Sequence, residues 1–387
     1  MGPAWSLRTF SPLPAKVPLD LVSFRPWQTQ LSISTARPGG FSGATVGMAE
    51  MPESTAAGWP YLPQPVYVQE LSHCEIWCGA MLLFEGRVAE TDTTGPRVTG
   101  LRIDGYSLDA LNDQPWYPYT NSEDSTYYTS GRLLLQAMAD TIGKVVPPMQ
   151  SIDFVDPGIR HLFSEVNGKT PAQLAQQFST EGSGGALFDF MMWGGRRSQF
   201  LPRVAPALPA YLEDVDGGVQ IQKVDSDLVG SVYVRYSDPV TGRSDQIAGP
   251  YTDPTFSTRY GGLSRAKEIN GGTLTATTAA AVGETYLAVY SQPQYKVQIK
   301  RDGWRGLRFP SGAFRSPWFV NASEWIKIAT LPMLPIIRTD VNATAGQMTL
   351  QVGAPPNNQN EMIRQLQTVS RAVTQGLNPT TFATNAA

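Results

Sequence analysis

Short runs in which apolar and polar residues alternate recur along most of the chain, and a glycine or proline bounds nearly every run. Clear examples are residues 31–35, 219–224, 230–236, 295–300 and 348–352. Because successive side chains of a strand point to opposite faces of a sheet, this alternation predicts half-buried β-strands. The 36 glycines and 31 prolines indicate many turns. We therefore expect a mainly β (α+β) fold with two or more barrel or sandwich domains.

Changes in the pattern divide the chain into five segments. Residues 1–30 are expected to be a proline-rich N-terminal arm, because proline removes a donor from a strand ladder. The other segments are an N-terminal β-barrel domain at 31–125, a small α/β domain at 126–205, a second β-barrel domain with long loops at 206–356, and a C-terminal helix and tail at 357–387. The loops are expected at residues 243–280, which are rich in Gly, Ser and Thr, and a strand is expected at residues 285–290.

Two helices are indicated by their ends. Residues 170–173, Thr-Pro-Ala-Gln, are typical of a capping box, and Leu174 and Phe178 then share one face of a short helix. The second helix runs from Asn358 to Gly376. Its apolar seam is too narrow to cover a core of its own, so we expect it either to dock on another chain or to pack on its own β domain. The seam consists of Met362, Leu366, Val369 and Val373.

The two cysteines, Cys74 and Cys78, lie in a run that alternates like a strand. They would share one face of that strand, and His73 and Glu75 would share the other. Two cysteines cannot staple a chain of this length, so both are expected to be reduced and packed. A metal site needs three or four convergent ligands, and the only other histidine is His161. No metal ligand is therefore predicted.

Charge is scarce in this chain and nearly balanced. Charged residues make up 16%, against about 25% in ordinary soluble domains, which favours burial of surface against other subunits. The net charge of −3 provides no basic field, which argues against a general nucleic-acid binder. No run approaches the roughly 18–20 apolar residues of a spanning helix, and no secretory signal is visible. We expect a chain made in the cytoplasm that does not itself insert into a membrane.

Three polar groupings could carry chemistry, but each lacks a complete motif. His161 and Glu165 lie one helical turn apart without a nucleophile nearby, so a structural pair is favoured. Asp214 and Asp216 resemble a fragment of a calcium loop whose terminal Glu is missing, which favours a hairpin turn. Residues 194–197, Gly-Gly-Arg-Arg, lack the P-loop lysine pattern. The sequence predicts no catalytic residue and no cofactor.

The densest aromatic and basic stretch spans residues 301–325. It contains Trp304, Trp318 and Trp325, interleaved with Arg301, Arg305, Arg308 and Arg315. Such side chains could stack on single-stranded nucleic acid or on a sugar. Trp and Arg are also enriched at protein interfaces, and in a chain with so little charge we favour a contact with a neighbouring subunit.

Four stretches, taken in order, resemble minor tail proteins of long-tailed bacteriophages. These are the baseplate- or tail-tip-hub type, related to the central hub of contractile tails. The stretches are residues 34–41 with a Pro-Gly-Gly turn, residues 74–88 with a hairpin that ends in Glu-Gly-Arg-Val, residues 189–193 together with 200–203, and residues 352–356 before the terminal helix.

The resemblance implies a structural virion protein that assembles as a ring, commonly a homotrimer, with tube-like β-barrel domains. The N-terminal β domain would be the hub domain. Such a protein would sit in the tail between the tail tube or distal tail protein and the tip or fibre proteins, near the tape measure protein. The resemblance implies no active site.

The sequence leaves two other functional classes of protein open. One is a receptor- or carbohydrate-binding tail-tip protein, possibly hydrolytic, for which residues 304–325 would supply the aromatic surface. Hydrolysis would require two carboxylates about 5–10 Å apart in a cleft. The other class is a cellular β-sandwich binding module unrelated to phage.

Overall fold

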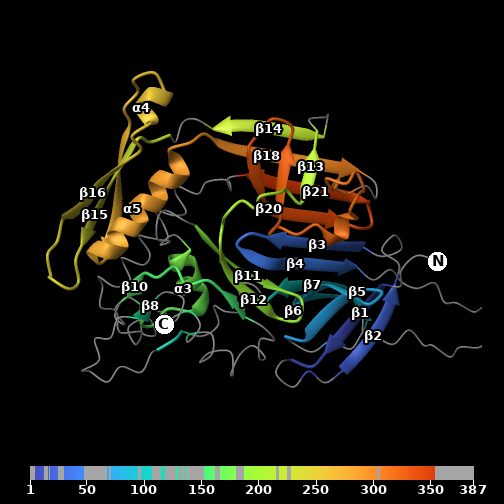
Figure 1. The fold of residues 1–387 in the computed structure, drawn as a ribbon. Helices are drawn as coiled ribbons and strands as arrows, with labels where there is room; N and C mark the ends of the chain where they lie inside the picture. Colours follow the sequence, from blue (N-terminus) through green and yellow to red (C-terminus); the bar gives the residue numbers. More distant parts are fainter. Residues whose placement is uncertain are drawn as a thin grey trace, which may run out of the picture.

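The fold is known from a computed structural model of the chain. It describes residues 5–12, 16, 18–24, 30–47, 68, 71–94, 97–106, 115–117, 128–129, 134, 137, 152–161, 166–179, 187–214, 218–224, 228–302 and 306–353. Strands dominate this part of the chain, and helices are few (Figure 1). The prediction of a mainly β fold is confirmed. The C-terminal helix, with Met362, Leu366, Val369 and Val373, and also Trp304, lie outside the described residues.

Most strands belong to one sixteen-stranded sheet. Its main path runs through β14 (Val219–Val224), β18 (Gln294–Asp302), β21 (Gln347–Gly353), β20 (Met333–Asn342), β3 (Gln30–Ala36), β4 (Gly39–Gly47), β7 (Arg97–Gly105), β6 (Met81–Thr94), β5 (His73–Cys78), β1 (Trp5–Phe10) and β2 (Pro18–Phe24). Neighbours on this path are antiparallel. The two end strands, β14 and β2, do not pair with each other. Among the described strands the sheet is therefore open, and the closed barrels expected from the sequence are not seen.

The pairing of β3 with β20 explains why the sheet stays open. It sets Ile33 opposite Val341, and the buried hydroxyls of Thr35 and Thr339 lie 2.6 Å apart. The N-terminal strands thus continue directly into strands from the end of the chain, as the blue and orange-red strands of Figure 1 show. The N-terminal strands and the C-terminal strands therefore pair with each other through β3 and β20, and neither group closes into a barrel of its own.

Within the predicted N-terminal arm, β1 and β2 form an antiparallel ribbon. Strand β1 alternates between buried and half-buried positions and pairs with β5. Leu7 is almost fully buried, and Trp5 lies in the same hydrophobic core. This part of the arm therefore belongs to the sheet.

The small α/β region packs β11 (Phe188–Trp193) and β12 (Arg197–Pro202) under helix α3 (Pro171–Phe178). β9 (Ile152–Phe154) lies parallel to β12, and β8 (Tyr128–Thr129) pairs with β10 (Arg160–His161). The predicted capping box is confirmed, since the Thr170 hydroxyl accepts the Gln173 N–H and the Gln173 side chain accepts the Thr170 N–H. Leu174 and Phe178 are fully buried on its inner face.

A second unit projects from the sheet (Figure 1). It has three strands in the order β16 (Gln246–Thr252), β15 (Ser231–Ser237) and β17 (Ala266–Thr273). Helix α5 (Ala276–Tyr290) lies along these strands, and the short helix α4 (Phe256–Arg259) stands at one end.

Two sequence expectations fail in this unit. The strand expected at residues 285–290 is the second half of α5, and the long loops expected at residues 243–280 contain β16, α4 and β17. The local pattern was misread because Ala279, Val282 and Tyr286, which recur at helical spacing, are buried against the small sheet, and packing outweighs the weak helix propensity of Thr, Val and Tyr. Thr275 caps the start of α5 through the Thr278 N–H.

Four hydrophobic cores account for the packing of the described residues: one in the N-terminal strands, one in the α/β region, one in the C-terminal strands and one under α5. β13 (Tyr211–Glu213), β19 (Trp325–Ile328) and the 3-10 helix η3 (Pro317–Phe319) border the third core. No described helix is long and apolar enough to cross a membrane. Cys74 and Cys78 are free and buried, as predicted, and burial raises the pKa of Cys74 to about 12.

Candidate functional site

Two buried clusters of charged side chains stand out because both join the α/β region to the rest of the fold. The junction cluster consists of Arg37, Asp189 and Arg203. The hairpin cluster consists of His73, Glu75, Glu85, Tyr106 and Arg196. Each lies where strands distant in sequence meet.

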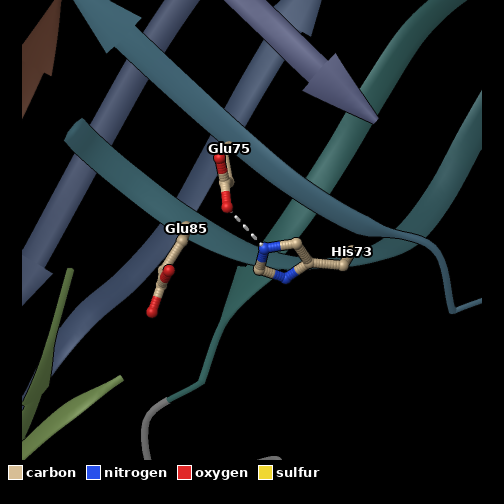
Figure 2. Close-up of side chains that lie close together, drawn as sticks. All are labelled: His73, Glu75 and Glu85. Carbon is tan, nitrogen blue, oxygen red and sulfur yellow. Dashed lines mark hydrogen bonds and ion pairs between the residues drawn. The ribbon is translucent and has the colours of Figure 1, made fainter. Parts of the chain in front are cut away.

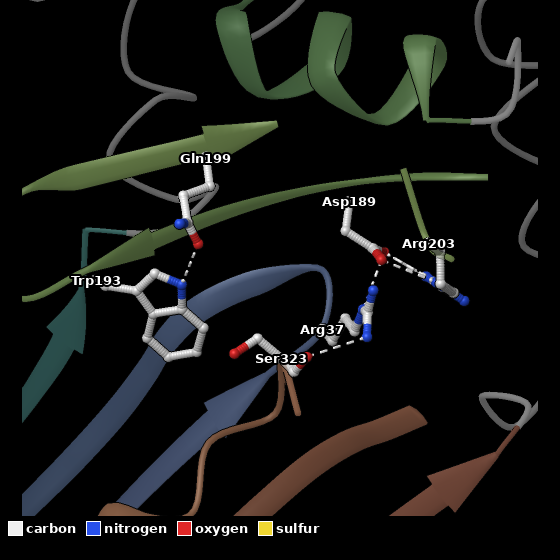
Figure 3. Close-up of polar contacts among 6 residues, drawn as sticks. All are labelled: Arg37, Asp189, Trp193, Gln199, Arg203 and Ser323. Atoms are coloured by element: carbon white, nitrogen blue, oxygen red, sulfur yellow. Dashed lines mark hydrogen bonds and ion pairs between the residues drawn. The ribbon is translucent and has the colours of Figure 1, made fainter. Parts of the chain in front are cut away.

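The junction cluster is centred on the fully buried carboxylate of Asp189 in β11 (Figure 3). Arg37 Nε donates to its Oδ2 at 2.5 Å, and Arg203 Nε donates to the same oxygen at 2.9 Å. Arg203 Nη2 donates to Oδ1, which completes a two-pronged contact. Arg37 Nη1 also reaches the carbonyl oxygen of Ser323 at 3.3 Å. The cluster therefore ties the β3–β4 turn, the β11–β12 hairpin and the segment before β19 together.

The backbone around Arg37 explains how this contact can form. Its N–H donates to the Ile337 carbonyl in β20 at 2.7 Å. β11 runs parallel to the start of β4 and sets Met192 beside Gly40. Gly40 has φ +87°, and a Cβ there would lie 2.1 Å from the Met192 carbonyl oxygen. Only glycine permits this close approach, so the Pro-Gly-Gly turn lets β11 reach the sheet.

The charges of the junction cluster compensate one another. Burial alone would raise the pKa of Asp189, but Arg203 and Arg37 hold it below its usual range. Burial lowers the pKa of Arg37, although the negative charge of Asp189 acts in the opposite direction. Two cations around one anion leave every oxygen of the carboxylate bonded, so this is a satisfied structural link.

In the hairpin cluster, two carboxylates face each other across the β5–β6 hairpin, because Glu75 is directly opposite Glu85. His73 Nε2 lies 3.1 Å from Glu75 Oε1 (Figure 2). The other ring nitrogen of His73 lies 2.7 Å from the Tyr106 hydroxyl. Trp77 Nε1 donates to Glu75 Oε2 at 2.8 Å. A dense set of polar groups is thus enclosed within a β-hairpin.

Lys16 and Arg196 add positive charge to the hairpin cluster. Lys16 Nζ donates to Glu75 Oε1 at 2.6 Å, and the Arg196 backbone N–H donates to Glu85 Oε1 at 2.5 Å. Arg196 lies in the β11–β12 turn with φ 57°, a strained value for a residue with a side chain. Its side chain is buried, yet Nε and Nη1 have no hydrogen-bond partner among the described residues. Arg196 therefore carries most of the free-energy cost of the hairpin cluster, through its backbone conformation and its unbonded nitrogen atoms.

The two carboxylates differ in their proton affinity. Burial would raise the pKa of Glu75, but bonds from His73, Lys16 and Trp77 lower it to about 2. Burial raises the pKa of Glu85, because the backbone bonds and the charge of Arg196 compensate it only in part. Burial also lowers the pKa of His73.

The hairpin cluster does not suit a divalent metal, although ligand atoms of His73, Glu75 and Glu85 lie within 4.8 Å of one another. Both oxygens of Glu75 already accept hydrogen bonds. Two cationic side chains, Lys16 and Arg196, flank the carboxylates, and a metal ion would have to displace or repel them. Glu75 and Glu85 are also 4% and 2% exposed, so this pair does not line a cleft open to a sugar chain.

The described tryptophans of the predicted interface stretch make contacts within the chain. Trp318 packs edge-on against Trp5 with ring centroids 4.8 Å apart, and Trp325 lies 5.3 Å from the Arg37 guanidinium. Arg315 bonds Glu324 at 2.8 Å. Both rings remain half-buried, so the interface role of Trp318 and Trp325 stays a prediction.

The other sequence candidates are not brought together. Asp214 pairs with Arg308 at 3.2 Å on the surface, and Asp216 lies outside the described residues. His161 is buried with its ring centroid 4.8 Å from that of Phe178. Glu165 also lies outside the described residues.

Sequence reasoning missed the two clusters, although five of their residues lie in the stretches that resemble phage tail proteins. Arg37 belongs to the first stretch, Glu75 and Glu85 to the second, and Asp189 and Arg203 to the third. One usable signal was a single acid within an apolar strand, as at Asp189. The structure shows that the first and third stretches touch through buried charge, and that Glu85 of the second stretch accepts a bond from Arg196, in the turn between the two parts of the third.

Comparison with known proteins gives a consistent fold relationship. No family model matches the sequence, and no curated protein matches it either. Three solved structures share the fold along nearly the whole chain: a tail protein from Neisseria meningitidis MC58, the 43 kDa tail protein of prophage MuSo2 from Shewanella oneidensis, and the prophage tail protein gp18 from Listeria monocytogenes EGD-e.

The similarity to these proteins lies in the fold and not in the sequence. The TM-scores are 0.55, 0.55 and 0.58, in the same order, and the sequence identities are 12%, 14% and 10%. The alignments cover 92%, 92% and 95% of this chain and 97%, 99% and 99% of the other chains. The chain therefore shares the architecture of these tail proteins over at least 92% of its length.

Proposed function

We propose that this chain is a structural component of a bacteriophage tail and is not an enzyme. The observation that carries the proposal is the fold similarity to three tail proteins, which covers at least 92% of this chain and at least 97% of each of the others. Fold alone does not define function. The sequence resemblance in residues 34–41, 74–88 and 189–193 with 200–203 is further support, and Arg37 of the first stretch contacts Asp189 of the third.

Within the tail, we assign the chain to an oligomeric hub at the tip or baseplate. It would form a ring, in the simplest case a homotrimer, and join the tail tube or distal tail protein to tip or fibre proteins. The tape measure protein would be a further neighbour. The low charge content of 16% supports burial of surface in an assembly of this kind. The chain would act in the virion tail after assembly in the host cytoplasm.

The candidate contact residues follow from the same proposal. The seam of Met362, Leu366, Val369 and Val373 would dock on a neighbouring subunit or on the next tail component. The tryptophans would serve a subunit interface; of these, Trp318 and Trp325 keep part of their rings exposed.

Mass measurement tests the proposal. The full chain should form a closed oligomer at micromolar concentration, alone or with its tail partners, and negative-stain images should show rings. Truncation after Pro356 should leave a folded body and weaken ring closure or attachment of the next component. A strict monomer under all these conditions would contradict the hub assignment. Infectious tails built with the truncated chain would show that the C-terminal helix has no role in assembly.

The alternative of a hydrolytic tip protein gains no support from the described carboxylates. Glu75 and Glu85, which lie opposite each other, are enclosed by the hairpin and by the β11–β12 turn. A glycosidase needs both groups at a cleft that admits substrate.

A further inference from the structure

Two apolar surfaces lie open to water in parts of the chain that are described without a gap, residues 187–214 and 228–302. One is the strap, which we define as residues 204–209 between β12 and β13. The other is the face of the small sheet β16-β15-β17 that points away from α5, called here the outer face. Contiguous apolar surface on a protein usually marks a place where a partner binds.

The strap has the sequence Val-Ala-Pro-Ala-Leu-Pro and contains no polar side chain. Residues 204–208 are exposed, with Val204 at 64% and Leu208 at 79%. Both ends are anchored, because the backbone N–H groups of Arg203 and Ala210 donate to carbonyl oxygens of the fold at 2.6 and 2.9 Å. Surface loops are normally polar. The strap therefore presents an apolar surface that is held in place at both ends.

The small sheet has one covered and one open face. Val232, Val234 and Ile269 pack with α5 in a common core. Because side chains alternate along a strand, Tyr233 and Arg235 of β15 point to the other side, the outer face.

The strand register places further residues on the outer face. Ile247 of β16 is opposite Arg235, and Glu268 of β17 is opposite Tyr233. Pro250 lies in the bulge of β16 opposite Tyr233 and is exposed. Ile247 is 54% exposed, and the Glu268 side chain is 52% exposed. The outer face thus combines an apolar row with a pair of charged residues, and it lies open to water.

The charges of the outer face are already engaged within the chain. Arg235 Nε donates to Glu268 at 2.7 Å, and Arg235 Nη1 lies 3.7 Å from Asp245. A charged partner segment would have to compete with these pairs or leave its own charge poorly solvated. An uncharged, apolar segment such as the strap could cover Tyr233 and Ile247 without disturbing them.

The strap and the outer face of one chain cannot reach each other. The strap leads into β13 beside the C-terminal strands, whereas β15 and β16 project on the opposite side of the molecule (Figure 1). Helix α5 lies between the small sheet and β10, so the outer face points away from the rest of the chain. Two different surfaces of identical chains can meet only in a heterologous contact, and such contacts close into a ring when repeated around an axis.

We propose that the strap of one copy docks on the outer face of the small sheet of the next copy, with Leu208 packed against Ile247 and Tyr233. Both apolar surfaces would then leave water together. This inference rests on the proposed function and deepens it, because repetition of the contact would close the ring of the hub.

Substitutions at the two surfaces test the contact in the full chain. Leu208→Asp and Ile247→Lys should each weaken self-association at least about tenfold, measured by analytical ultracentrifugation, because each would bury a charge against an apolar surface. The two changes in one chain should restore most of the association, since the new charges are opposite and adjacent. Val155→Asp alters a valine that is 43% exposed elsewhere on the surface and should leave the oligomer unchanged.

Cysteine pairing tests the same contact without relying on charge. Leu208→Cys and Ile247→Cys, made in separate chains and assembled together under mild oxidation, should form a covalent dimer. Neither variant should do so alone, because a heterologous contact joins unlike surfaces. The native Cys74 and Cys78 are buried and should not take part.

The inference is overturned if Leu208→Asp and Ile247→Lys both leave the oligomer mass unchanged, or if the mixed cysteine variants form no covalent dimer. A covalent dimer from Leu208→Cys alone would bring two straps together and would also overturn it. In these cases an intact oligomer leaves the hub assignment standing. A strict monomer of the unaltered chain, with and without tail partners, would overturn both.

Discussion

The junction cluster and the hairpin cluster are both buried, both charged and both built on the β11–β12 hairpin, yet they are satisfied to different degrees. In the junction cluster, Arg37 and Arg203 occupy both oxygens of Asp189. In the hairpin cluster, two acids face each other, and two buried nitrogen atoms of Arg196 find no hydrogen-bond partner in the described part of the chain.

This difference shows that burial of charge does not have a single consequence. Removing one partner of a satisfied cluster leaves an uncompensated buried charge, which is strongly destabilising. Removing a group that is already poorly compensated costs little and can even stabilise the fold. The following substitutions should therefore separate the two clusters.

The largest effect is expected from Asp189→Ala, which leaves Arg37 and Arg203 buried without their anion. We expect a loss of about 3–5 kcal/mol in the free energy of unfolding, measured by urea denaturation. Asp340→Ala, which breaks an exposed pair with Arg338, is the control and should cost less than about 1 kcal/mol. Equal losses in the two variants would show that the junction cluster has no special role.

Glu75→Gln should rank second, because Glu75 accepts bonds from His73, Lys16 and Trp77. Gln keeps the shape but loses the charge and one acceptor, so we expect a loss of about 2–3 kcal/mol. Glu90→Gln removes an exposed charge that pairs with Arg102 and should change stability by no more than about 0.5 kcal/mol. A Glu75→Gln variant with unchanged stability would refute the inference that Glu75 stabilises the fold more than Glu85 does.

The two acids should also give opposite pH dependences. The pKa of Glu75 is lowered to about 2, so its contribution is present above the unfolded-state value near 4.5 and is lost as the pH falls toward 2. The pKa of Glu85 is raised, so stability rises as the pH falls through that raised value toward 4.5.

Glu85→Gln should therefore be neutral or stabilising by about 1 kcal/mol at pH 7, and it should remove the rise in stability on mild acidification. Thermal unfolding across a pH series measures both effects. Glu75→Gln is the matched comparison, since it should remove the loss at low pH and leave the rise in place. Identical pH profiles for these variants would contradict the assigned pKa directions.

The smallest effect is expected from Arg196→Gly. Glycine tolerates φ 57° and removes a buried guanidinium whose Nε and Nη1 have no hydrogen-bond partner among the described residues, but it also removes the positive charge that partly compensates Glu85, so the two effects should offset each other to within about 1 kcal/mol. Arg197→Gly, one residue later in β12, should destabilise by about 0.5–1 kcal/mol, because glycine weakens a strand. The sign of the difference between these two variants is the informative measurement.

The sequence determined those features that depend on neighbouring residues. Alternation predicted β3, β14, β15, β18 and β21, and the capping box at Thr170 predicted the start of α3. These predictions are sound because the period of a strand and the bonds of a helix cap involve residues only a few positions apart.

The tertiary structure decided what depends on residues distant in the chain. Thr35 meets Thr339 across 304 positions, and this contact joins the N-terminal and C-terminal strands into one open sheet. The same holds for α5, which burial against β15 and β16 stabilises as a helix in a segment that reads locally as a strand. Arg37 reaches Asp189 and Glu85 reaches Arg196 over 152 and 111 positions. No local pattern encodes such pairings, because the free energy that stabilises them arises only when both partners leave water together.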